Sequence, residues 1–152
     1  MTPWERVNEL TRRAGELKLA RDFTGMLPLR EEIASILEEA EADSKRVADA
    51  LNYLAALNLQ LERYSVAETY ARRSVVYYEE HGAENREALA TYVHLLAMIL
   101  AFQGRYEEAI PYAERAITEY SVFHTPDDDF LTRRKAQLED LRKGRVSMQF
   151  EL

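Results

Sequence analysis

The sequence predicts an all-α fold made of three antiparallel helix hairpins and one further helix near the C-terminus. Only five Gly and four Pro occur in 152 residues, and apolar residues alternate with polar ones only in the last few positions. Two stretches, ERYSVAETYARRSV at 62–75 and GRYEEAIPYAERAI at 104–117, share six of fourteen residues at a spacing of 42. A repeat of this length indicates that the same pair of helices is stacked more than once.

Clusters of helix-breaking residues divide the chain into seven predicted helices. Alternate connections are very short, so the helices on either side of them must run antiparallel as hairpins. The predicted breaks lie at 22–24, 42–44, 62–65, 81–85, 103–105 and 124–126.

The second and third copies of the repeat carry small residues where two helices are expected to cross. Ala97 and Ala109 form such a pair, because helices of one hairpin approach closely only where small side chains face each other. Tyr106 and Tyr112 are expected to fill the space between hairpins, and Gly104 to end the helix before them. A first, degenerate copy has Leu10, Ala14, Phe23, Met26 and Leu29 at equivalent positions.

A fourth copy begins after residue 126 but is incomplete. Leu138 occupies a core position, whereas Glu139 stands where the earlier copies have Ala55 and Ala97. We therefore predict a capping helix at 127–143, with a polar outer face and four inward residues. Thr125 is expected to cap it and Pro126 to lie in its first turn. The inward residues are Phe130, Leu131, Leu138 and Leu141.

At these residues the chain resembles the tetratricopeptide repeat family. The residues that carry the resemblance are Leu54, Ala55, Tyr64, Ala67, Val75, Leu96, Ala97, Gly104, Tyr106, Ala109, Ala116 and Ile117. The 42-residue spacing is similar to the repeats of kinesin light chains. The resemblance implies a right-handed α-solenoid forming one domain at 1–144, with repeats at about 3–42, 44–84 and 85–125, followed by a tail at 145–152.

In proteins of this family the first helix of each hairpin lines a concave groove that usually binds a peptide or helix of another protein. We therefore expect a non-catalytic scaffold or adaptor with a protein or peptide partner. Two of the candidate groove residues, Met98 and Phe102, are alternatively interpreted as core residues beneath the capping helix, because the helix segment LLAMILAF at 95–102 is apolar nearly all round. The candidate partner-binding residues are Asn52, Leu59, Gln60, Thr91, His94, Met98 and Phe102.

Composition argues against several other functions. A formal net charge of -7 disfavours nucleic acid, and no apolar run is long enough for a membrane span. The three His residues have no metal-ligand spacing, Cys is absent, and no nucleophile, phosphate-binding or metalloprotease motif is present. We predict no enzymatic activity, no metal, no cofactor and a cytoplasmic location.

Two features suggest self-association into a homo-oligomer as an alternative function. Residues 31–43 are acidic and residues 130–145 are basic, so the two ends are complementary. The tail RVSMQFEL places Val146, Met148, Phe150 and Leu152 on one side of an extended chain. Such a tail is expected either to dock along its own solenoid or in the groove of a neighbour, or else to fray.

Overall fold

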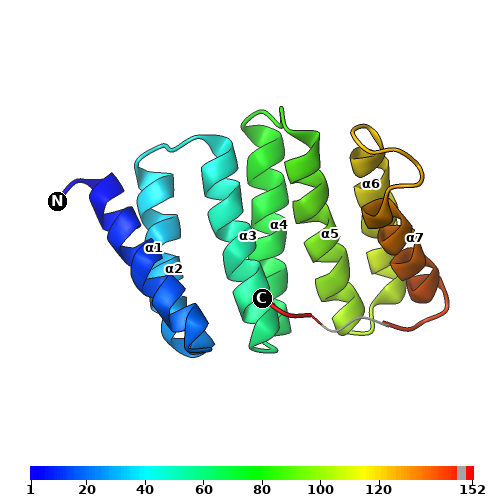
Figure 1. Ribbon diagram of the computed structural model, residues 1–152, viewed down its shortest axis with the longest axis horizontal. Coiled ribbons are helices and arrows are strands. Elements are labelled where there is room, and N and C mark those ends of the chain that lie inside the picture. The colour runs from blue at the N-terminus through cyan, green and yellow to red at the C-terminus, as the bar shows by residue number, and fades with distance from the viewer. Residues whose placement is uncertain (147–149) are drawn as a thin grey trace.

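The computed structural model describes residues 1–146 and 150–152, and these residues form seven α-helices and no strand (Figure 1). The number of helices and the breaks between them agree with the prediction. The helices are α1 (Pro3–Leu19), α2 (Phe23–Glu39), α3 (Ser44–Gln60), α4 (Tyr64–Glu80), α5 (Arg86–Phe102), α6 (Tyr106–Ser121) and α7 (Asp129–Arg142).

Local sequence explains where several helices begin. Thr2 and Glu5 form a capping box at the start of α1, in which each side chain bonds the backbone N–H of the other residue. The side chains of Asp43 and Asn85 cap α3 and α5 by accepting from Arg46 N and Ala88 N. Each cap satisfies an N–H group that has no partner inside its helix.

The predicted start of the capping helix is wrong by two residues. Asp128, rather than Thr125, is the cap of α7, and its Oδ1 accepts from Phe130 N and Leu131 N at 2.8 and 3.3 Å. Pro126 therefore lies in the preceding turn and outside the helix. The carboxylate satisfies two helix N–H groups at once, which fixes the start at Asp129. Leu131, Leu138 and Leu141 are buried as expected, and Phe130 is half-buried.

The tight turn of each hairpin contains one residue in the left-handed backbone region. These residues are Arg21, Glu62 and Gly104, with φ of 56°, 57° and 74°. They occupy equivalent positions, 41 and 42 residues apart. Only Gly adopts this conformation without a steric penalty, so the third hairpin has the least strained of the three turns.

Consecutive helices pack against one another along the whole row. Ala97 and Ala109 are both fully buried in the same cluster, as the small-residue pattern predicts. Tyr106 and Tyr112 pack against this cluster from positions of partial exposure. The cluster includes residues of α3 to α7, so the second and third hairpins and the capping helix share one core.

The degenerate first copy keeps the apolar positions of the repeat. Leu10, Ala14, Met26 and Leu29 are buried, and Phe23 is half-buried. No helix among the described residues has the length and apolarity required to cross a membrane.

Candidate functional site

The first helices of the hairpins form the inner side of the row. α3, the first helix of the second hairpin, contacts α5, the first helix of the third hairpin. A cavity of about 380 Å³ opens between α2 and α4, the second helices of the first and second hairpins. We call the face formed by α1, α3 and α5 the groove.

One end of the groove is open and polar. A cavity of about 250 Å³ lies where α3 and α5 begin, and its lining includes Asn52 and Thr91 from the predicted set. The Oδ1 atom of Asn52 is buried and has no hydrogen-bond partner among the described residues. Thr91 is exposed, and its hydroxyl donates to the Glu87 carbonyl at 3.1 Å and lies 3.0 Å from the Tyr120 hydroxyl. The full lining is Lys45, Asp49, Asn52, Asn85, Glu87, Ala88, Thr91 and Tyr92.

Asp49 organises this polar end. Its carboxylate accepts from Lys45 Nζ at 2.8 Å and from the buried Tyr92 hydroxyl. The hydrogen bond to Asp49 raises the pKa of Lys45, and burial together with the same carboxylate raises the pKa of Tyr92. Lys45 is therefore cationic and Tyr92 neutral over the physiological range, so the pair holds Asp49 in a fixed orientation.

A second cavity, of about 240 Å³, lies on the other side of α3, towards α1 and α2. The guanidinium of Arg30 stacks 3.8 Å from the centre of the Tyr53 ring, and its Nε has no hydrogen-bond partner. Asp49 borders both this cavity and the polar cavity. The groove therefore offers polar hollows on either side of α3.

His94 is largely covered and is not an open feature of the groove. Burial and the nearby charge of Arg134 on α7 lower the pKa of His94 to about 3. Arg134 itself lies 4.4 Å from the centre of the Phe130 ring. The imidazole is neutral at physiological pH and lies beneath the capping helix.

The remaining predicted site residues lie at the apolar end of the groove. Leu59 and Met98 are each 4% exposed, so they contribute to its floor and not to its open surface. Phe102 is half-buried against the main core cluster. Gln60 is partly exposed, and its Oε1 accepts a hydrogen bond from the backbone of Leu152 at 3.0 Å.

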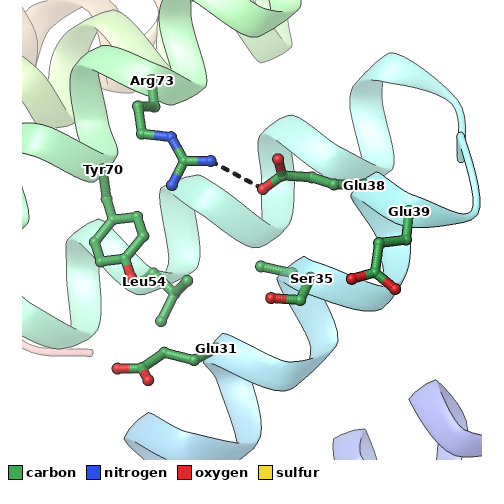
Figure 2. Close-up of a pocket in the computed structure, with 8 residues that line it drawn as sticks. Glu31, Ser35, Glu38, Glu39, Leu54, Tyr70 and Arg73 are labelled. Atoms are coloured by element: carbon green, nitrogen blue, oxygen red, sulfur yellow. Dashed lines mark hydrogen bonds and ion pairs between the residues drawn. The ribbon is translucent and has the colours of Figure 1, made fainter.

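The cavity between α2 and α4 lies on the outer side of the row. Figure 2 shows Glu31, Ser35, Glu38 and Glu39 of α2 facing it, with Leu54 at its base and Tyr70 and Arg73 of α4 opposite. Arg73 Nη2 bonds Glu38 Oε1 at 3.0 Å across the opening. The acidic side of this cavity thus already has a cationic partner within the chain.

Many of the charges at the two ends of the row are likewise paired internally. In the acidic segment, Glu32 bonds Arg6 at 2.8 Å, in addition to the pairing of Glu38. In the basic segment, Arg142 pairs with Glu139 and Arg145 with Asp140. These contacts reduce the charge left for head-to-tail association of two copies.

Among the described residues, no group of three or more His, Cys, Asp and Glu side chains is placed to hold a metal ion. Sequence reasoning missed Arg30, Tyr53 and Tyr92 as groove-lining residues. The signal for Tyr92 was available in part, because its position is 43 residues after Asp49 and therefore one residue out of register with it.

The fold and the groove define a helical-repeat protein of the kind that presents an inner surface built from successive hairpins. A family model described as tetratricopeptide repeat matches residues 46–121, which are half of the chain. The chain belongs to the tetratricopeptide repeat family, whose members are generally protein–protein interaction modules. The match falls on the second and third hairpins, α3 to α6, where the repeat pattern is strongest. No match was found among curated proteins.

Proposed function

We propose that this protein is a non-catalytic adaptor that binds an extended peptide of a partner protein in the groove formed by α1, α3 and α5. The observation that carries the proposal is the combination of polar hollows and an apolar floor on one continuous face. Peptide recognition by repeat proteins needs both, because polar groups bond the peptide backbone and apolar pockets take its side chains.

Asn52 and Thr91 are the groups best placed to bind a peptide backbone. Asn52 lines the polar cavity and its Oδ1 has no hydrogen-bond partner among the described residues, so a peptide N–H that reaches it gains a hydrogen bond worth about 0.5–1.5 kcal/mol. Thr91 lies across the same cavity, and its hydroxyl, which donates to Glu87 O, keeps acceptor capacity for a peptide N–H. The partner-binding role of His94 is the weakest of the predicted set, because α7 covers its ring.

Selection of peptides from a random library displayed on phage tests this proposal. The selected peptides are expected to bind the wild-type chain and to lose at least about tenfold in affinity for the double variant N52A/T91V. The matched control is E38A/R73A, which removes the ion pair of the outer cavity and leaves the groove intact. Binding that survives N52A/T91V and disappears with E38A/R73A would refute the proposal and identify the outer face as the binding surface.

A further inference from the structure

Residues 150–152, at the C-terminal end of the chain, lie on the groove. The C-terminus lies in front of α3, well away from α7 in the row (Figure 1). Leu152 N donates to Gln60 Oε1 at 3.0 Å, at the end of α3. The side chain of Leu152 packs against the buried cluster of Met26, Leu27 and Leu57. Met148 of the predicted alternating pattern lies outside the described residues.

The described tail residues alternate as an extended peptide does. Phe150 packs against the core cluster shared by α3 to α7, and Leu152 packs at the junction of α2 and α3. Glu151, between them, is exposed and lies 3.6 Å from Arg21 Nη1. Side chains of an extended chain point alternately to opposite sides, so two apolar residues two positions apart enter the surface together.

These contacts are those by which a solenoid recognises a foreign peptide. One side-chain amide receives a backbone N–H, and apolar surfaces receive one aromatic and one aliphatic side chain. The polar end of the groove, around Asn52 and Thr91, is not among the surfaces that residues 150–152 contact. Residues 150–152 therefore lie at the apolar end.

We propose that the C-terminal segment is an internal ligand of the groove, and that the partner is an extended peptide with an aromatic and an aliphatic residue two positions apart, which must displace it. This inference rests on the proposed function of the groove as a peptide-binding surface. The Phe-Glu-Leu sequence at 150–152 is the internal model for the partner's contact residues.

The affinity of the tail for the groove determines how far the tail lowers the affinity for a partner peptide. Residues 150–152 make one backbone hydrogen bond and one exposed ion pair with the rest of the described chain, and neither Phe150 nor Leu152 is fully buried. Such a segment binds weakly as a free peptide, whereas a short linker holds it at an effective concentration of roughly 1 mM. For a free-peptide Kd of roughly 0.1 mM, the closed state outweighs the open state about tenfold, and the affinity for a partner falls by about the same factor.

The test measures fluorescence anisotropy of a labelled peptide with the sequence of residues 145–152. The proteins are the full wild-type chain and the full-length variant F150A/L152A, whose tail no longer offers its apolar side chains. The peptide is expected to bind the variant about tenfold more tightly than the wild type. A peptide carrying the same two alanines is expected to bind neither. Val76→Ser, on the exposed side of α4, is the matched control and is expected to behave as wild type.

A second variant tests the groove side of the contact, where Gln60 accepts the backbone N–H of the tail. Gln60→Ala, combined with F150A/L152A, removes the acceptor and is expected to weaken peptide binding by about 3- to 10-fold. Circular dichroism checks that each variant keeps the helix content of the wild type. Equal peptide affinity for wild type and F150A/L152A, or no binding to the open variant, would overturn the proposal.

Three further outcomes separate this inference from the alternatives. A dimer in sedimentation experiments that dissociates in F150A/L152A would mean that the tail docks in a second copy, which overturns the internal contact. Phage-selected peptides that depend on Asn52 but are not displaced by the tail peptide would overturn this inference and leave the proposed function standing. A tail peptide that binds the open variant, when no selected peptide binds, would overturn the proposed function and with it the partner named in this inference, and would leave only the internal contact of the tail.

Discussion

Acidification from pH 7 to pH 5 is expected to destabilise the protein through His94. The folded state lowers the pKa of this residue from 6.5 to about 3, because the ring is buried and lies near the charge of Arg134. Below pH 6.5 the unfolded chain binds a proton at His94 that the folded chain does not bind. A group with a lowered folded pKa of this kind stabilises the fold fully above pH 6.5, and the contribution is lost as the pH falls towards 3.

The magnitude follows from the two pKa values. Each pH unit between them changes the free energy of unfolding by about 1.4 kcal/mol, so the change from pH 7 to pH 5 is about 2 kcal/mol at full burial. The ring keeps some exposure, which reduces the expected loss to roughly 1–2 kcal/mol.

Urea unfolding at pH 7 and pH 5 measures this loss directly. The variant H94Q has no titrating group at this position, so the difference between the two pH values is expected to shrink by the same 1–2 kcal/mol, within the uncertainty of about 10–15% in extrapolated free energies. The matched control is H81Q, which changes an exposed histidine at the end of α4. A wild-type loss that H94Q leaves unchanged would show that His94 is solvated in the folded state and that α7 does not cover it.

Three other substitutions test the packing and the turns by urea unfolding at pH 7. Ala109→Leu overpacks the fully buried crossing in the third hairpin and is expected to cost roughly 1–3 kcal/mol, so a change below about 0.5 kcal/mol would contradict close packing there. Ser74→Ala removes the 2.9 Å hydrogen bond from the Ser74 hydroxyl to the Ala48 carbonyl, which links α4 to α3, and is expected to cost about 1–3 kcal/mol. The control is Ser65→Ala, which changes an exposed serine of the same helix. Gly104→Ala adds a Cβ that meets no neighbour within 4 Å, so its expected cost of roughly 1 kcal/mol comes from the φ of 74° alone. An unchanged free energy of unfolding would refute the claim that the turn requires Gly.

The repeat pattern is sufficient to predict most of the fold. Small residues such as Ala97 and Ala109 indicate where helices cross, and the spacing of breaks indicates hairpins, because both features are encoded locally and repeated. The start of α7 was missed because three consecutive aspartates follow a proline, and several of these residues are competent caps.

The candidate site is less accessible to sequence reasoning, because exposure depends on which segments far apart in the chain cover each other. The register places His94 on the inner face, but it does not show that Arg134 and its helix cover that position. The register likewise places Gln60 in the groove, yet it does not show that a residue 92 positions later bonds its side chain. The alternating pattern of the tail left docking on its own solenoid, docking in a neighbour's groove and fraying all open, and it did not indicate a binding place.

Amide NMR of the full-length F150A/L152A chain, titrated with the tightest peptide from the phage selection, tests the central claim most directly. If the groove is the working surface, the largest shift changes fall on inner-face residues of α3 and α5, including Asn52, Gln60 and Thr91. Shift changes centred on Glu38 and Arg73, with the inner face unaffected, would contradict the account.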